Sequence, residues 1–206
     1  YASVITRDVS KRHKIRNKEL FDRVVRYIIE NVGKTFSASS IVKFLKSENR
    51  SLSVETIYNY LKWLSEAFII YPCKRYDLQG KSVLKTQEKY YLSDISIKYS
   101  QMGFDRKMLS AVFENIVFLE MKRRGYDVYI GKNNTKEIDF VGVRRDEKIY
   151  IQVSDNISGQ ETFQREYTPL LQIRDAYPKM IIARTKHPMY TYEGIEVHDI
   201  VDWLLG

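Results

Sequence analysis

The sequence is poor in cysteine and histidine and has no long apolar run. Its single cysteine, Cys73, excludes an internal disulfide and fits a reducing compartment, so we expect a cytoplasmic protein. No apolar run approaches the roughly 20 residues that a membrane-spanning helix needs, and residues 1–17 lack the apolar core of a signal peptide. His13, His187 and His198 are scattered without the spacing of metal ligands.

Two catalytic or nucleotide-binding motifs are also missing. No Ser-His-Asp or Cys-His arrangement is visible. Gly80-Lys81-Ser82 imitates the end of a phosphate-binding loop, but Arg75 stands where that loop needs its first glycine. We therefore expect this chain not to hydrolyse ATP. The sequence begins with Tyr1 and not with Met, which favours a fragment of a longer protein.

The positive charge is concentrated in the first half. Residues 1–100 contain 19 Lys and Arg against 10 Asp and Glu, a net +9, whereas residues 101–206 contain 15 against 16, a net −1. A basic half predicts contact with nucleic acid or with an acidic partner surface, and ordinary solubilising charge is the alternative.

Helical spacing of apolar residues predicts three helices in the first half, at residues 17–32, 37–46 and 54–68. The inward stripe of the third helix would be Val54, Ile57, Leu61, Leu64 and Phe68. Strands follow at 69–76 and 83–92, with a turn at Gly80. Three helices and a hairpin predict a winged-helix domain over residues 17–92.

The second half predicts a different architecture after a linker at residues 93–104. A helix at 105–124 precedes strands at 127–131, 137–143 and 148–153, joined by turns that include Asn133-Asn134. A helix at 160–176, a buried strand at 179–184 and a short helix at 199–205 complete it. The predicted fold class is therefore α/β, or α+β overall, with an α-β-β-β-α-β domain over residues 105–206.

That order is the order of a restriction-endonuclease-like, or PD-(D/E)XK, core. In such a core, acids hold a Mg²⁺ that polarises the phosphate and activates water, and a lysine steadies the developing charge. The matching positions are Glu114, Asp139, Gln152 and Ser154, with Glu114 and Asp139 as the metal ligands. Glu137 shares a strand face with Asp139.

The catalytic lysine is missing from this pattern, because Ser154 occupies its position and cannot carry a positive charge. A lysine elsewhere would be needed for cleavage, and Lys132, Lys136 and Lys148 are nearby in sequence. In the alternative interpretation, the polar residues of the pattern merely line a solvated edge of the sheet.

The winged helix supplies candidate contacts to nucleic acid: on the third helix and on the hairpin, these are Asn59, Lys62, Lys74, Arg75, Lys81 and Lys85. Glu55 and Glu66 on the same helix oppose DNA, and Trp63 favours packing on protein. A protein partner or self-association is therefore the alternative to DNA.

Three stretches of the chain resemble one family. SVITRDVSKRHKIRN, YNYLKWLSEAFIIYPCKRYDLQGKSVLKTQEKYYLSDISI and FENIVFLEMKRRGYDVYIGKNNTKEIDFVGVRRDEKIYIQVS look like the C-terminal region of prokaryotic predicted AAA+ ATPases. The resemblance implies a winged helix and a nuclease-like domain of unknown function, with residues 1–16 as the connection from an absent ATP- and Mg²⁺-binding module.

The sequence therefore predicts three alternative functions. The first is a non-catalytic recognition module that binds nucleic acid or a protein partner. The second is a Mg²⁺-dependent nuclease that uses Glu114, Asp139 and Gln152. The third is a structural module for oligomerisation or docking.

Overall fold

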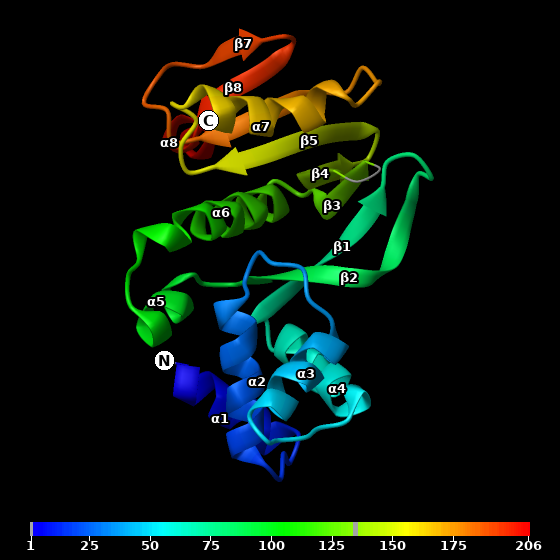
Figure 1. Ribbon diagram of the computed structural model, residues 1–206, viewed down its shortest axis with the longest axis vertical. Helices are drawn as coiled ribbons and strands as arrows, with labels where there is room; N and C mark the ends of the chain where they lie inside the picture. Colours follow the sequence, from blue (N-terminus) through cyan, green and yellow to red (C-terminus); the bar gives the residue numbers. More distant parts are fainter. Residues whose placement is uncertain (1, 134–135) are drawn as a thin grey trace. The chain divides into compact units, whose positions relative to one another are not determined.

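The computed structural model describes residues 2–133 and 136–206, with side chains described for residues 7–84, 88–133 and 136–206 (Figure 1). It is a mixed α/β structure that divides into two compact units. Unit 1 comprises Tyr1–Cys73 and Thr86–Asp105, and unit 2 comprises Lys74–Lys85 and Arg106–Gly206. No described helix is both long and apolar enough to cross a bilayer.

Unit 1 contains the three predicted helices, now α2 (Lys18–Glu30), α3 (Ala38–Ser47) and α4 (Val54–Glu66). Each helix begins after a polar N-cap residue whose side-chain oxygen accepts a backbone N–H of the first turn. The N-cap residues are Asn17, Ser37 and Ser53, respectively. Their apolar stripes form the core of the unit, where the rings of Phe21 and Tyr60 meet edge to face at 4.9 Å.

The predicted inward stripe of the third helix is wrong at both ends. Val54 is 39% exposed and Phe68 is 69% exposed, whereas Ile57, Leu61 and Leu64 are buried. Val54 lies in the first turn of α4. The helix ends at Glu66, and Phe68 adopts a φ of +53° beyond it, so the helical spacing no longer applies there.

The predicted connection and the predicted linker both contain helices. Residues 1–16 include α1 (Ala2–Arg12), and residues 93–104 include α5 (Ser96–Met102). Lys98 of α5 is buried and its Nζ donates to the Ile29 and Glu30 carbonyl oxygens, 3.2 and 3.4 Å away, at the C-terminal end of α2. Burial is the main cause that lowers the pKa of Lys98, and repulsion from Lys34 lowers it further. A short helix with one buried lysine has no recognisable apolar period, which explains the missed prediction.

Two long strands, β1 (Ile70–Asp77) and β2 (Ser82–Leu92), each have residues in both units. In unit 1, Ser93 N–H donates to the Ile69 carbonyl at 3.1 Å. In unit 2, β1 pairs in parallel with β3, with Arg75 opposite Ile130.

Unit 2 continues with the short 3-10 helix η1 (Arg106–Met108) and α6 (Leu109–Arg123). The remaining elements are β3 (Asp127–Asn133), β4 (Lys136–Arg144), β5 (Glu147–Ser154), α7 (Gln160–Leu171), β6 (Lys179–Ala183), β7 (Tyr190–Tyr192), β8 (Ile195–Asp199) and α8 (Ile200–Leu205). The described strands form one mixed sheet in the order β2-β1-β3-β4-β5-β6-β8-β7. The predicted turn at Asn133-Asn134 falls partly outside the described residues.

The β7–β8 hairpin was not predicted. Its turn is Glu193-Gly194, and both residues have positive φ, +49° and +77°. A two-residue turn with two positive φ angles matches the right-handed twist of a hairpin. Glycine at the second position was the available sequence signal.

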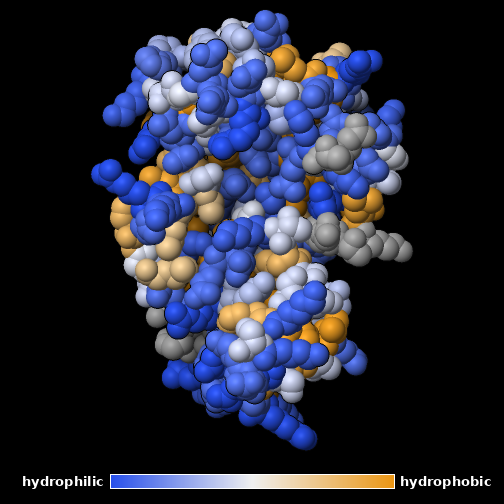
Figure 2. Space-filling model, viewed as in Figure 1, coloured by the Kyte–Doolittle hydropathy of each residue, from blue (hydrophilic) through white to orange (hydrophobic). Residues whose placement is uncertain are grey.

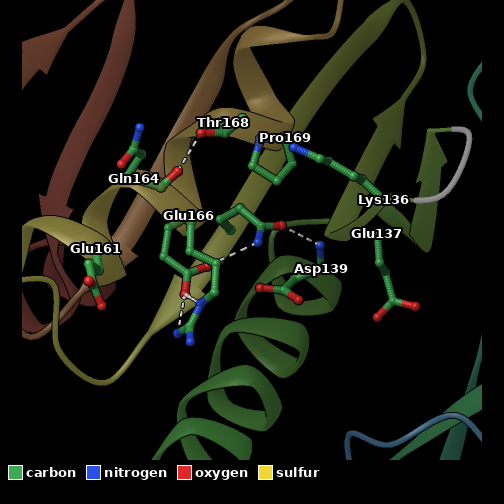
Figure 3. A pocket seen from close by; sticks show the side chains of 10 residues that line it. Lys136, Glu137, Asp139, Glu161, Gln164, Glu166, Thr168 and Pro169 are labelled. Carbon is green, nitrogen blue, oxygen red and sulfur yellow. Dashed lines mark hydrogen bonds and ion pairs between the residues drawn. The ribbon is translucent and has the colours of Figure 1, made fainter.

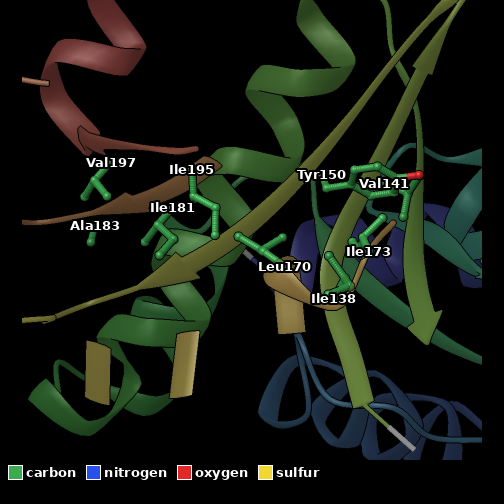
Figure 4. Packing of buried hydrophobic residues seen from close by; sticks show 9 residues of the cluster. All are labelled: Ile138, Val141, Tyr150, Leu170, Ile173, Ile181, Ala183, Ile195 and Val197. Atoms are coloured by element: carbon green, nitrogen blue, oxygen red, sulfur yellow. The ribbon is translucent and has the colours of Figure 1, made fainter. Parts of the chain in front are cut away.

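The core of unit 2 lies between the sheet and its helices (Figure 4). One buried cluster contains Ile138, Val141, Tyr150, Leu170, Ile173, Ile181, Ala183, Ile195 and Val197. Leu170 of α7 and Ile173 just beyond it belong to this cluster, so α7 covers this face of the sheet. On the α6 side, Phe118 meets Phe140, and a Cβ on Gly142 would lie 2.7 Å from Met121 Cε. A larger residue at Gly142 would therefore require the Met121 side chain and its neighbours to shift.

Candidate functional site

Asp139 and Gln152 lie on the adjacent strands β4 and β5 and are joined by a hydrogen bond. The Asp139 backbone N–H donates to Gln152 Oε1 at 2.7 Å, and the Val153 backbone N–H donates to Asp139 Oδ2 at 2.9 Å. The antiparallel register of the two strands extends from Arg144 opposite Glu147 to Phe140 opposite Ile151. Side chains therefore provide the cross-strand hydrogen bonds directly beyond the regular ladder.

Glu166 of α7 extends this network, although sequence reasoning missed it. Gln152 Nε2 donates to Glu166 Oε2 at 3.1 Å, and Arg165 Nη2 lies 2.8 Å from Glu166 Oε1. Glu166 is only 7% exposed, so both contacts compensate a buried carboxylate. The hydrogen bond to Glu166 and the Glu166 charge raise the pKa of Arg165, with smaller effects from Asp155 and Asp139.

A cavity of about 600 Å³ opens over this network (Figure 3). The β4 and β5 strands contribute Lys136, Glu137, Asp139 and Gln152 to its lining. The helix α7 contributes Glu161, Gln164, Arg165, Glu166, Thr168 and Pro169. Two of the four predicted catalytic residues, Asp139 and Gln152, thus share one cavity with a lysine and an arginine.

The other two predicted catalytic residues do not line that cavity. Ser154 is 3% exposed, and its Oγ donates to the Asn156 carbonyl oxygen at 3.1 Å. Glu114 is half-buried on α6. In the part of the chain that the structure describes, no three His, Cys, Asp or Glu side chains gather as a metal site.

The three candidate lysines lie in different surroundings. Lys136 lines the cavity beside Asp139. Lys148 Nζ instead lies over the rings of Tyr76 and Tyr177, at 5.4 and 5.1 Å from their centroids. Lys132 is half-buried on β3, opposite Glu137. Lys136 is therefore the one of these three that shares the cavity of Asp139.

The residues predicted to contact nucleic acid divide between the two units. Asn59 and Lys62 are exposed on α4 of unit 1, and Lys62 Nζ lies 3.8 Å from Glu66 Oε1. Lys74 and Lys81 are exposed in unit 2. Arg75 Nη2 lies 3.9 Å from Glu137 Oε2, and its side chain is 16% exposed. The side chain of Lys85 lies outside the described residues.

A basic segment in unit 1, residues 7–18, was not predicted as a site. Its exposed cations are Arg7, Lys11, Arg12, Lys14, Arg16 and Lys18, and Asp8 is its one acidic residue. None of these six cations forms an ion pair with another described side chain, whereas Arg23 nearby in sequence pairs with Glu19 and Glu48.

The basic segment packs beside α4. The His13 imidazole stacks on the Trp63 ring with centroids 4.3 Å apart and planes inclined by 9°. Trp63, whose type favoured a protein partner, thus packs partly within its own unit. This contact places part of the basic segment beside the helix that carries Asn59 and Lys62.

Comparison with known proteins gives the family. Residues 1–107 match the family described as "Domain of unknown function (DUF8612)", and the chain belongs to it. An uncharacterized protein of Haemophilus influenzae is 36% identical over 205 residues, covering 100% of this chain and 50% of the relative. The uncharacterized protein MJ1544 of Methanocaldococcus jannaschii is 33% identical over 144 residues, covering 67% and 31%.

The chain spans half or less of the length of these two curated relatives. No solved structure matches it.

Proposed function

We propose that this chain is a non-catalytic recognition module of a longer AAA+ ATPase, and that unit 1 binds duplex DNA through its phosphates. The observation that carries the proposal is the basic segment, six exposed cations without ion pairs among the described side chains, packed against α4 through His13 and Trp63. Several unneutralised cations in one short segment favour a polyanion, because each phosphate contact releases bound counterions.

The winged-helix part of the proposal is supported by the order of elements from α2 to β2. Helices α2, α3 and α4 are followed by the strands β1 and β2, which is the order of that motif. The third helix is the one that enters the major groove in such domains. Asn59 and Lys62 are exposed on α4, and the exposed Lys62–Glu66 pair is weak enough for a phosphate to replace.

The loss of catalysis is supported by the hydrogen bonds of unit 2. The Gln152 amide is engaged through both Oε1 and Nε2, and Asp139 Oδ2 already accepts a backbone N–H. Ser154, in the position of the catalytic lysine, is buried and neutral. We infer a nuclease-like fold whose polar centre holds β4, β5 and α7 together. ATP and Mg²⁺ would bind to the ATPase module outside this chain.

A Mg²⁺-dependent nuclease is the second candidate, and one observation favours it. Lys136 shares the cavity of Asp139, so a cation is available near the carboxylate. If Mg²⁺ binds, Asp139 and Glu137 are the acids of β4 that line this cavity.

The test of DNA binding reverses two charges of the basic segment. Lys11→Glu/Arg12→Glu should weaken binding of a labelled duplex about 10- to 100-fold near physiological salt. The slope of log affinity against log salt should fall by about 2, one unit per lost phosphate contact. Fluorescence anisotropy at several salt concentrations measures both quantities.

The matched control is Lys43→Glu/Lys46→Glu on α3, which changes the net charge equally at exposed positions of the same unit. This control should retain most of the affinity. Equal weakening of duplex binding by both double variants would show that the effect comes from net charge and not from the basic segment. No duplex binding by the unmodified chain at low salt would reject the proposal and favour protein docking or oligomerisation.

A further inference from the structure

A second, larger cavity lies within unit 2 and contains none of the predicted catalytic residues. It has a volume of about 1040 Å³. Gln79 and Lys81 from the turn between β1 and β2, Lys148 from β5, and Gln172, Arg174 and Tyr177 from the segment after α7 contribute to its lining. A cavity of this size is at the upper end of the range for small-molecule sites, roughly 300–1,000 Å³.

The charges of this cavity favour an anion. Lys81, Lys148 and Arg174 line it, and none of them forms an ion pair with another described side chain. The acid in its lining, Asp175, is already engaged, because it accepts a hydrogen bond from Tyr150 Oη at 2.5 Å and lies 3.3 Å from Lys179 Nζ. The cavity therefore presents cations whose charge no neighbouring carboxylate neutralises.

The cavity also presents an aromatic surface. Tyr177 is 42% exposed, and Lys148 Nζ lies 5.1 Å from its ring centroid and 5.4 Å from that of Tyr76. These cation–π contacts hold the ammonium group beside two rings. Proteins bind single-stranded nucleic acids by combining exposed aromatic rings with cations. The bases stack on the rings and the phosphates contact the cations.

The concave shape decides between single-stranded and duplex nucleic acid. The bases of a duplex are stacked inside it, so they cannot stack on a side chain within a cavity. An unpaired nucleotide has a free face for Tyr177 and a phosphate within reach of surrounding cations.

We propose that this cavity binds unpaired nucleotides of a single-stranded nucleic acid, with a base on Tyr177 and phosphates near Lys81 and Arg174. The proposal rests on the proposed function, in that the chain binds nucleic acid, and adds a site on the other unit with a different strand preference. The exposed amides of Gln79 and Gln172 are available to base edges or sugars.

The experiment measures binding of a fluorescent 12-nucleotide oligothymidylate to the whole chain. Tyr177→Ala should weaken it about 10-fold, as expected for the loss of one stacked base, and Tyr177→Phe should retain it. Lys81→Glu/Arg174→Glu should weaken it about 10- to 100-fold and reduce the salt slope. Lys122→Glu/Arg184→Glu, exposed cations of unit 2 that line neither cavity, is the matched control and should bind like the unmodified chain.

The outcomes separate this proposal from that for unit 1. Both proposals are supported if Lys11→Glu/Arg12→Glu loses duplex binding and keeps oligonucleotide binding, and Tyr177→Ala keeps duplex binding and loses oligonucleotide binding. Oligonucleotide affinity unchanged in Tyr177→Ala and in Lys81→Glu/Arg174→Glu overturns the cavity proposal alone. Thymidine monophosphate that competes as strongly as the 12-mer overturns the assignment to a strand. Absence of all binding overturns both proposals.

Discussion

The Asp199→Ala variant should lose about 2–4 kcal/mol of the free energy of unfolding, because one carboxylate serves three backbone donors. Asp199 is 7% exposed and is the N-cap of α8. Its oxygens accept N–H groups of Thr185, Lys186 and Val201 at 3.0, 2.7 and 2.9 Å. Removing it would leave donors of α8 and of the loop after β6 without their acceptor. Urea denaturation followed by circular dichroism measures the loss.

The matched control is Asp202→Ala, which removes an exposed carboxylate from the first turn of the same helix and should change stability by about 0.5 kcal/mol. Asp199→Asn should recover part of the loss, because an amide oxygen still accepts one of these bonds. Equal stability of Asp199→Ala and the unmodified chain would refute the role given to this carboxylate.

The same carboxylate predicts a pH dependence with a defined sign. Burial raises the pKa of Asp199, but the backbone N–H donors outweigh burial, and the net pKa is lowered from 3.8. A lowered folded-state pKa means that the unfolded chain binds more protons. The contribution to stability is therefore present above pH 3.8 and is lost as the pH falls through the lower folded-state pKa. Asp199→Asn should flatten this acid limb of the stability curve.

The sequence predicted those elements whose apolar residues follow one clear period. The helices α2, α3 and α4 and the strands β3, β4 and β5 lie within two or three residues of the predicted ranges. The helix α5 was not predicted, because the buried face includes a lysine that is satisfied by carbonyls of α2, a tertiary contact. The strand β7 has three exposed residues and no alternation of burial, so only its turn marked it.

Sites were predictable to the extent that strand pairing determines them. Asp139 and Gln152 were proposed together from their positions on neighbouring strands, and a hydrogen bond joins them. Glu166 could not be found in the same way, since it comes from a helix whose rotation against the sheet is set by packing around Leu170. The basic segment was visible as charge, but its place beside α4 depends on the His13–Trp63 stack.

The polar centre of unit 2 is a place where stability and chemistry can be separated. The antiparallel pairing of β4 and β5 ends where the Gln152 side chain accepts the Asp139 backbone N–H and the Asp139 side chain accepts the Val153 backbone N–H. An active site would need these oxygens for a metal ion and water. A structural role needs them to accept backbone N–H groups, and in the described structure they accept the N–H groups of Asp139 and Val153.

Asp139→Ala should therefore lower the free energy of unfolding by about 1–3 kcal/mol, because it leaves the Val153 N–H without this acceptor. Asp139→Asn, the matched control, keeps an oxygen in place and should lose less. The non-catalytic proposal predicts that labelled duplex and single-stranded DNA remain intact with the unmodified chain and with both variants, with or without Mg²⁺.

The opposite result has an equally specific form. Mg²⁺-dependent cleavage by the unmodified chain that disappears in both Asp139→Ala and Asp139→Asn would establish a nuclease and overturn the proposal. Lys136→Met would then test whether the lysine in the same cavity replaces the one missing at Ser154, because methionine keeps the length of the side chain without its charge. Cleavage retained in Lys136→Met would shift the stabilising charge to Arg165, whose guanidinium is already bound to Glu166.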